Sequence, residues 1–198
     1  MRALVYVRDE ELADRRAKGL DRWDEVWEGV LHMTPAPSYE HQRMVDSLVE
    51  FLRPRLRTSG RGTLVSGINV FRERPATTDY RIPDLTFVAA ARERLLGADG
   101  IRGGGPDAVI EIRSPDDETF DKLSFYAAIG VKEIIVVDRD SKEPQVFRLV
   151  GAQYAAARPD PERWLYSDVL HIRLLHGPGN PPHLRIEDPG ALPAALML

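Results

Sequence analysis

The sequence contains no cysteine among its 198 residues. This absence excludes a disulfide framework, a thiolate nucleophile and a cysteine-ligated zinc site, and it is typical of a cytoplasmic protein. No segment has the run of about 20 apolar residues that a membrane-spanning helix needs. Residues 1–20 also lack the apolar stretch of a signal peptide. We therefore expect a cytoplasmic protein without a membrane partner.

Other signatures are absent as well. The formal net charge is −4, which excludes a protein that coats nucleic acid indiscriminately. Residues 53–62 nevertheless hold four arginines and no acid, and they form a candidate basic patch.

There is no Gly-x-Ser-x-Gly elbow of a serine hydrolase. The glycines at 103–105 lack the lysine of a phosphate-binding loop. His171, His176 and His183 do not have the spacing of a common zinc site, and we expect them on an irregular surface.

The composition, with 43% hydrophobic and 29% charged residues, is that of an ordinary globular protein. We expect a single domain over residues 1–198, with a core at about 24–157 and an irregular extension at 158–198 that holds at best short strands at 164–166 and 169–174. The patterns predict a helix at 9–18, a β-hairpin at 26–33 and a longer helix that begins after the N-cap Ser38. Apolar residues of this longer helix recur on one face: Val45, Leu48, Val49, Leu52 and Leu56.

The rest of the chain predicts further strands and shorter helices. We expect strands at 63–71, 80–89, 109–113 and 133–138, a short helix in ARERLLG, a helix at 117–129 capped by Gly130, and a hairpin at 145–157. The strand at 133–138 (EIIVVD) is apolar enough to be buried on both faces. A strand, a helix and this strand predict a parallel crossover. The fold class is therefore α+β, a mixed sheet flanked by helices.

Two carboxylates stand at positions where they can meet. Side chains alternate along a strand, so Glu111 and Arg113 share the face opposite Ile110 and Ile112. Asp84 follows the rigid Pro83 at the start of a neighbouring strand, and pairing of the two strands brings both carboxylates to one edge. Close carboxylates repel each other unless a positive charge lies between them. Mg²⁺ and Mn²⁺ accept such oxygen ligands, so the pattern points to a divalent-metal site.

Lys122 is the third member of this group, in the helix that follows the Glu111 strand. An amine there orients an attacking water, or helps to deprotonate it if the pKa of the amine is lowered. Arg113 stays protonated and is suited to binding a phosphate oxygen. An alternative is that Glu111 and Arg113 form a solvated strand face, Asp84 a turn, and Lys122 a surface ion pair of little energetic value.

The same residues carry a resemblance to a known family. Pro83-Asp84, then Glu111-Ile112-Arg113-Ser114, and further on Asp121, Lys122, Tyr126, Gly130-Val131, Glu133 and Val137-Asp138 stand in the order and near the spacing of the Uma-type restriction-endonuclease family. This family is a branch of the PD-(D/E)XK nuclease superfamily. The segment GVLHMTPAPSYEHQRMVDSL is similar to its N-terminal hairpin and helix. The resemblance covers roughly residues 27–138.

The resemblance implies a restriction-endonuclease-like core and a Mg²⁺- or Mn²⁺-dependent site with Asp84 and Glu111 as metal ligands. The sequence departs from the superfamily pattern at Arg113, where a lysine is usual, and Lys122 matches the place to which that lysine has moved in related families. Glu40 is a candidate for a further metal ligand from the N-terminal helix. The alternative for Glu40 is a first-turn acid favoured by the helix dipole.

We therefore expect a divalent-metal-dependent endonuclease that hydrolyses phosphodiester bonds of DNA, with catalytic residues Asp84, Glu111, Lys122 and Arg113. Such folds commonly cut both strands with two sites, so a homodimer is expected. The alternative is a catalytically inactive protein of the nuclease fold that binds nucleic acid or another protein. The negative charge and the arginine at 113 favour this alternative.

Overall fold

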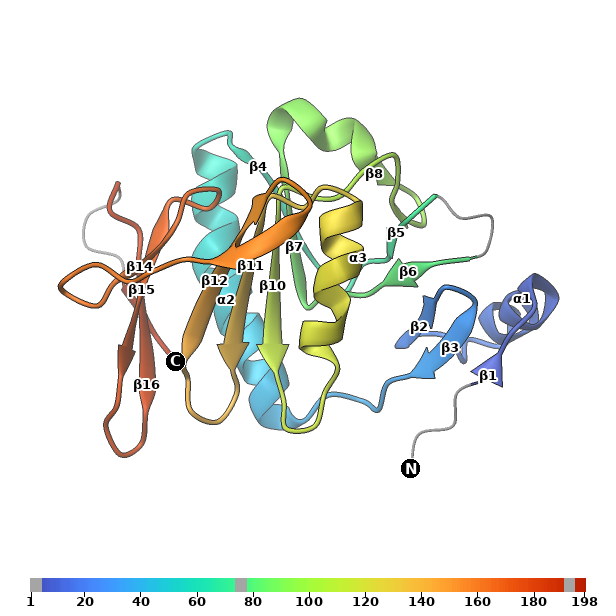
Figure 1. Ribbon diagram of the computed structural model, residues 1–198, viewed down its shortest axis with the longest axis horizontal. Helices are drawn as coiled ribbons and strands as arrows, with labels where there is room; N and C mark the ends of the chain where they lie inside the picture. Colours follow the sequence, from blue (N-terminus) through green and yellow to red (C-terminus); the bar gives the residue numbers. More distant parts are fainter. Residues whose placement is uncertain (1–4, 74–77, 191–194) are drawn as a thin grey trace.

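The computed structural model describes residues 5–73, 78–190 and 195–198. Within these residues the strands form three sheets, and a mixed six-stranded sheet stands at the centre (Figure 1). The N-terminal strands belong to a sheet on one side of it, and the C-terminal strands form a sheet on the other. None of the described helices combines the length and the apolar character needed to cross a membrane.

The elements follow one another in this order: β1 (Val5–Tyr6), α1 (Asp9–Ala17), β2 (Asp24–Trp27), β3 (Val30–Met33), α2 (Tyr39–Thr58), β4 (Gly62–Ser66), β5 (Val70–Phe71), β6 (Tyr80–Arg81), β7 (Leu85–Ala89), the 3-10 helix η1 (Ala90–Leu95), β8 (Leu96–Gly97), β9 (Gly100–Ile101), β10 (Ala108–Arg113), the 3-10 helix η2 (Thr119–Lys122), α3 (Leu123–Ala128), β11 (Glu133–Asp138), β12 (Pro144–Val150), β13 (Gln153–Ala156), β14 (Leu165–Ser167), β15 (Ile172–Gly177), β16 (His183–Glu187) and β17 (Ala195–Met197).

The central sheet has the order β13-β12-β11-β10-β7-β4. Strands β10 and β11 are parallel and in register from Ala108 opposite Glu133 to Arg113 opposite Asp138, so the predicted strand–helix–strand unit is confirmed as a parallel pair. Strand β7 runs antiparallel to β10 on its other side, with Leu85 opposite Ile110. The two strands that carry Asp84 and Glu111 are therefore neighbours, as predicted.

Helix α2 covers one face of this sheet. Its N-cap is Ser38, whose side chain accepts a hydrogen bond from the backbone N–H of His41 at 3.3 Å. The predicted apolar face packs into the core, with Val45, Leu48, Leu52 and Leu56 buried and Val49 partly buried. Pro54 lies inside the helix, which ends one turn later at Thr58. With 20 residues the helix is about 30 Å long, so its two ends lie in different regions of the molecule.

The two faces of β10 enter two different cores. Ile110 and Ile112 pack in the cluster under α2, whereas Val109 packs in the cluster under α3. The face that carries Glu111 is therefore covered by α3 and is not a solvated face. The burial of Glu111 raises the pKa of its carboxyl group.

Several predicted elements differ from the observed ones in extent. Residues 63–71 and 80–89 each form two strands that belong to different sheets, and the second interruption falls at Pro83 and Asp84. The predicted helix at 117–129 begins only at Thr119, because the Asp117 carboxylate accepts hydrogen bonds from the backbone N–H groups of Ser114 and Thr119. Gly130 follows α3 with φ +79°, as its predicted capping role requires.

The described part of 158–198 is more regular than expected: the strands expected at 164–166 and 169–174 are present as β14 and β15 with shifted bounds, and the part expected to be irregular holds two further strands. Strands β14 to β17 form an antiparallel sheet in sequence order. Its apolar side chains, among them Ile172, Leu174 and Leu184, belong to the core cluster of α2. Buried Glu133 at the start of β11 links this sheet to the central sheet. Its carboxylate accepts hydrogen bonds from the Ser167 hydroxyl and from the backbone N–H of Asp168.

Candidate functional site

Asp84 connects the strand pair to helix α2. Its Oδ2 accepts a hydrogen bond of 2.6 Å from the backbone N–H of Ile112 on β10. Its Oδ1 lies 2.9 Å from Nε2 of His41 on the first turn of α2. The carboxylate is held at the edge where the predicted convergence places it, and 21% of the side chain remains exposed. Asp84 is thus fixed by tertiary contacts and is more than a turn residue.

Glu111 lies one residue before Ile112 and is buried, with 4% exposed surface. Its Oε1 accepts a 2.6 Å hydrogen bond from the hydroxyl of Tyr126 on α3. Burial raises the pKa of Glu111 to about 7; the positive charge of Lys122 opposes this rise and the negative charge of Asp84 adds to it. A carboxylate in this position is suited to bind a cation, because a nearby positive charge relieves the cost of its burial.

Lys122 lies between two acids, as the last residue of η2. Its Nζ is 2.9 Å from Oε1 of Glu25 and 3.6 Å from Oε1 of Glu111. Burial on its own lowers the pKa of Lys122, but the charges of Glu111 and Glu25 raise it well above its ordinary value. The amine is therefore protonated at neutral pH. This argues against Lys122 as a general base, because that role requires a lowered pKa. Lys122 also does not form a surface ion pair, because only 14% of its side chain is exposed.

Glu25 on β2 is a site residue that the sequence did not indicate. It lies at the edge of the predicted hairpin, 97 positions before Lys122, and no local pattern links the two residues. Its Oε1 also accepts a hydrogen bond from the backbone N–H of Ile82, and its Oε2 accepts one from the Trp27 indole, both at 2.8 Å. The N-terminal hairpin therefore forms one side of the candidate site.

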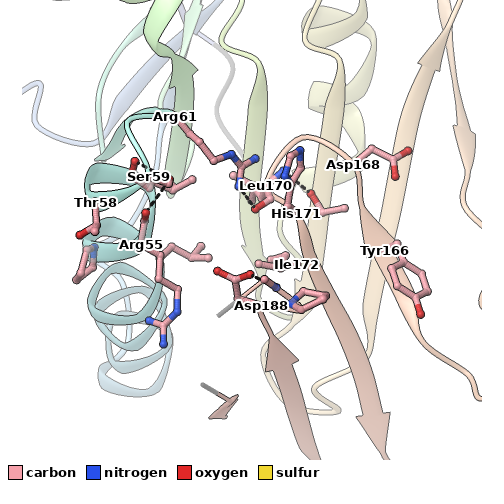
Figure 2. A pocket seen from close by; sticks show the side chains of 16 residues that line it. Arg55, Thr58, Ser59, Arg61, Tyr166, Asp168, Leu170, His171, Ile172 and Asp188 are labelled. Carbon is pink, nitrogen blue, oxygen red and sulfur yellow. Dashed lines mark hydrogen bonds between the residues drawn. The ribbon is translucent and has the colours of Figure 1, made fainter. Parts of the chain in front are cut away.

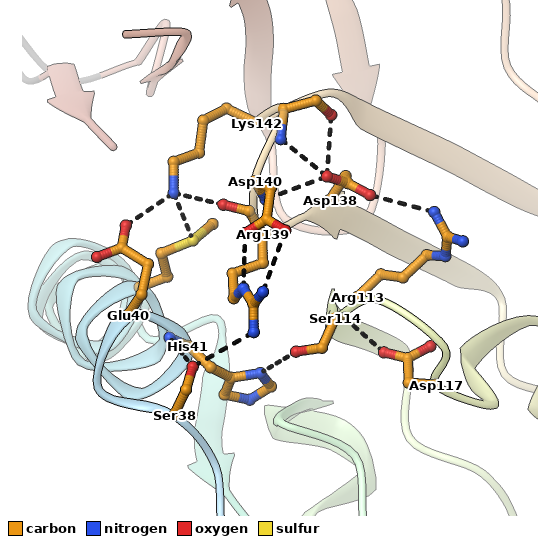
Figure 3. Close-up of polar contacts among 12 residues, drawn as sticks. Ser38, Glu40, His41, Arg113, Ser114, Asp117, Asp138, Arg139, Asp140 and Lys142 are labelled. Carbon is orange, nitrogen blue, oxygen red and sulfur yellow. Dashed lines mark hydrogen bonds and ion pairs between the residues drawn. The ribbon is translucent and has the colours of Figure 1, made fainter.

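His41 is the second residue that sequence reasoning missed. Figure 3 shows its ring at the first turn of α2, facing Ser114 at the end of β10. Its Nδ1 lies 3.4 Å from the Ser114 hydroxyl, and its Nε2 contacts Asp84. Burial on its own lowers the pKa of His41, but the hydrogen bond to Asp84 and the charges of Asp84 and Glu111 raise it above its ordinary value. The imidazole is thus placed to orient Asp84.

Glu40, the neighbour of His41, points away from this group. Its carboxylate contacts Arg43 at 2.8 Å and Lys142 at 2.9 Å, and 40% of the side chain is exposed (Figure 3). Hydrogen bonds from Arg43 and Lys142 lower the pKa of Glu40 to about 2. The structure does not bring Glu40 to Asp84 or Glu111, and its surroundings fit the alternative of a first-turn acid in a surface ion-pair cluster.

Arg113 lies beyond Glu111 at the end of β10 and turns toward the next strand. Its Nη1 is 3.1 Å from Oδ2 of Asp138 (Figure 3). Its guanidinium lies over the ring of Phe120, 5.3 Å from the ring centroid. About 38% of the side chain is exposed. Arg113 is therefore a partly exposed residue paired with Asp138, whereas the cation next to Glu111 is Lys122.

The donor set fits a hard divalent cation. Within residues 5–73, 78–190 and 195–198 there is no group of three or more His, Cys, Asp or Glu side chains arranged to hold a metal ion. Mg²⁺ does not need one, because it is often bound by one or two carboxylates together with waters and a substrate phosphate. Asp84 and Glu111 supply these two carboxylates. With Glu25 they place three acids around Lys122 and His41, which leaves the site negatively charged.

A separate pocket of about 960 Å³ lies between the C-terminal end of α2 and the C-terminal sheet (Figure 2). Residues Leu56, Ser59 and Ile172 are among those that line it, whereas the carboxylate group lies at the opposite end of α2. Arg61 borders this pocket and donates to the backbone carbonyls of Val169 and Leu170. The candidate basic patch at 53–62 is thus partly used in structural contacts, and it is remote from the site.

Comparisons with known proteins bear on the family and the fold. The family model Uma2, described as "Putative restriction endonuclease", matches residues 10–175. A crystal structure of "a putative nuclease belonging to DUF820" from Anabaena variabilis is similar, with a TM-score of 0.59 and 17% sequence identity over 74% of this chain and 82% of that chain. No curated protein matches the sequence. The predicted restriction-endonuclease-like α+β fold is confirmed.

Proposed function

This chain belongs to the Uma2 family of restriction-endonuclease-like proteins, and we propose that it is a divalent-metal-dependent nuclease that hydrolyses phosphodiester bonds of DNA. The observation that carries this proposal is the convergence of Asp84, Glu111 and Lys122. A carboxylate that directly precedes β7, a buried carboxylate from β10 and the largely buried ammonium of Lys122 from η2 meet beside the paired strands β7 and β10 of the central sheet.

Each residue has a distinct part in the reaction. Asp84 and Glu111 would hold Mg²⁺ or Mn²⁺, which when bound positions and acidifies a water and neutralises charge on the phosphodiester. Lys122 remains an ammonium and stabilises negative charge on the scissile phosphate. His41 keeps the Asp84 carboxylate in place through its 2.9 Å contact. The partly exposed Arg113 binds a phosphate oxygen next to the scissile bond with its fork of donors.

The first test is metal binding, because it requires no knowledge of the substrate. Thermal unfolding is followed with increasing Mn²⁺ or Mg²⁺ for the wild type, for Asp84→Ala and for the control Asp46→Ala, which removes an exposed carboxylate of α2. At a hundred times its dissociation constant a ligand adds about 2.7 kcal/mol. We expect the midpoint to rise by roughly 5 to 10 °C in the wild type and the control. We expect no rise in Asp84→Ala.

The second test is cleavage of plasmid DNA with Mg²⁺, with Mn²⁺ and with EDTA. The wild type and Asp46→Ala should nick or linearise the plasmid only with a divalent ion. Asp84→Ala and Glu111→Ala should be folded and inactive. An Asp84→Ala variant that still cleaves would sink this assignment.

We further propose a homodimer, because cutting both strands of a duplex commonly requires two sites and symmetric dimers are the commonest oligomers. Light scattering during gel filtration measures the mass directly. The expected value is twice the 22.3 kDa of the chain. A mass of one chain, together with nicking of only one strand, would contradict this part of the proposal.

A second candidate function is a catalytically inactive protein of the nuclease fold that binds nucleic acid or a protein. Arg113 favours it, because this residue stands where the superfamily has a lysine and its guanidinium contacts Asp138. The net charge of −4 also favours it. This candidate predicts that divalent ions have no effect on stability and that Lys122→Met is tolerated without loss of binding.

A further inference from the structure

The N-terminal hairpin contributes the carboxylate of Glu25 to the interior of the site. This side chain is 3% exposed. Two donors fix its orientation from opposite sides, since the Ile82 N–H bonds to Oε1 and the Trp27 indole N–H bonds to Oε2. Ile82 directly precedes Pro83 and Asp84, so one carboxylate links the hairpin, the turn that carries Asp84 and the Lys122 ammonium.

Lys122 does not lie midway between its two acids. Its Nζ is 2.9 Å from Oε1 of Glu25 and forms a hydrogen bond with it, whereas the distance to Oε1 of Glu111 is 3.6 Å. The Tyr126 hydroxyl donates to that same Oε1 of Glu111. The stronger contact of the ammonium is therefore with the hairpin and not with the strand that carries Glu111.

We propose that Glu25 is a positioning residue, which holds the Lys122 ammonium on the hairpin side of the site and so leaves the Glu111 carboxylate for a divalent cation. This inference rests on the proposed function, since it concerns the same metal site. Without the charge of Glu25, the ammonium moves to its remaining buried partner, Glu111. There it competes with the divalent cation for one carboxylate, because both are cations that seek the same oxygen atoms.

A double-mutant cycle on metal affinity tests this inference without any substrate. The dissociation constant of Mn²⁺ is measured from the EPR signal of the free ion for the wild type, Glu25→Gln, Lys122→Met and the double variant. Glu28→Gln is the matched control, because Glu28 belongs to the same hairpin but is exposed and contacts Arg72. Circular dichroism in EDTA establishes which variants are folded.

We expect Glu25→Gln to weaken Mn²⁺ binding roughly tenfold, the size of effect that a close unlike charge has on a carboxylate. Lys122→Met should tighten it, and Glu28→Gln should leave it unchanged. In the Lys122→Met background, Glu25→Gln should have at most a small effect, because the competing ammonium is gone. A direct metal ligand or a purely structural role of Glu25 would instead give the same loss in both backgrounds, and that result overturns the inference.

Trp27→Phe serves as a second probe if Glu25→Gln does not fold. It leaves the charge of Glu25 in place but removes the hydrogen bond to Oε2, which helps to hold the carboxylate in the orientation that reaches Lys122. The inference expects weaker Mn²⁺ binding in Trp27→Phe and no such loss when Lys122→Met is also present. Equal losses in both backgrounds overturn it.

Failure of the inference differs from failure of the proposed function. If the wild type binds Mn²⁺ through Asp84 and the cycle shows no coupling between Glu25 and Lys122, only the inference is wrong. If the wild type does not bind Mn²⁺, both are wrong.

Discussion

Replacing Glu111 by glutamine should stabilise the folded protein in the absence of metal, although the same change removes a proposed metal ligand. The pKa of Glu111 rises from its ordinary value of 4.5 to about 7, chiefly because the carboxyl group is buried. In the folded state the group therefore binds a proton between these two pH values, whereas in the unfolded state it does not. The stability that comes from this protonation is present below pH 4.5 and is lost as the pH rises through about 7.

The size of the stabilisation by Glu111→Gln follows from how far the pKa of Glu111 is raised. At about 1.4 kcal/mol for each tenfold change in proton affinity, the charged Glu111 costs the folded state up to about 3 kcal/mol above pH 7. Glutamine is neutral at every pH and keeps an oxygen to accept the Tyr126 hydrogen bond. Lys122 keeps its 2.9 Å contact with Glu25. Glu111→Gln should therefore raise the thermal midpoint at pH 8 by roughly 5 to 10 °C and have little effect at pH 5.

The assay is thermal unfolding in EDTA from pH 5 to pH 8.5 for the wild type, Glu111→Gln and Glu40→Gln. Glu40 is the matched control because its pKa shift has the opposite sign to that of Glu111. The pKa of Glu40 is lowered to about 2, so its charged form stabilises the fold at neutral pH. Its exposure keeps that contribution small. Glu40→Gln should lower the midpoint slightly at pH 8. A Glu111→Gln variant that is less stable than the wild type at pH 8, or equally stabilised at pH 5, would refute this reasoning.

Further predictions concern stability. Tyr126→Phe removes the only described hydroxyl that donates to the buried Glu111 and should lower the free energy of unfolding at pH 8 by about 1 to 3 kcal/mol in urea denaturation. It should also move the pH-dependent loss of stability to higher pH, because the Tyr126 hydrogen bond lowers the pKa of Glu111. Leu48→Ala, at a fully buried position on α2, should cost about 2 to 5 kcal/mol by the same measurement, and a loss below 1 kcal/mol would contradict its place in the core.

The central part of the fold was predictable because its signals are local. The alternation in 109–113, the apolar run in 133–138 and the helical spacing after Ser38 each define one element, and the observed elements agree with them. Of the C-terminal sheet only the strands β14 and β15 were predicted, for an equally local reason. Its alternating buried residues are spread over strands of three to six residues, and the Pro- and Gly-rich segment 178–182 interrupts the pattern between β15 and β16.

The site was predictable only where neighbouring strands or a crossover brought residues together. The pairing of β7 with β10 placed Asp84 near Glu111, and the crossover placed Lys122 near both. Glu25 and His41 depend on contacts across 97 and 43 positions, which no periodicity in the sequence specifies. The family resemblance implies an acid from helix α2, which points to Glu40. One step along a helix turns a side chain by about 100°, and that rotation gives the inward position to His41.

The burial of Glu111 links the proposed metal site to the stability of the fold. Three carboxylates, Asp84, Glu111 and Glu25, surround one ammonium and one imidazole, so the cluster carries more negative than positive charge in a region with little water. A bound divalent cation and the substitution Glu111→Gln correct this imbalance by different routes, one by adding positive charge and the other by removing negative charge. Both should therefore stabilise the fold above pH 7, but their effects should not add, because the glutamine removes the carboxylate on which the cation acts.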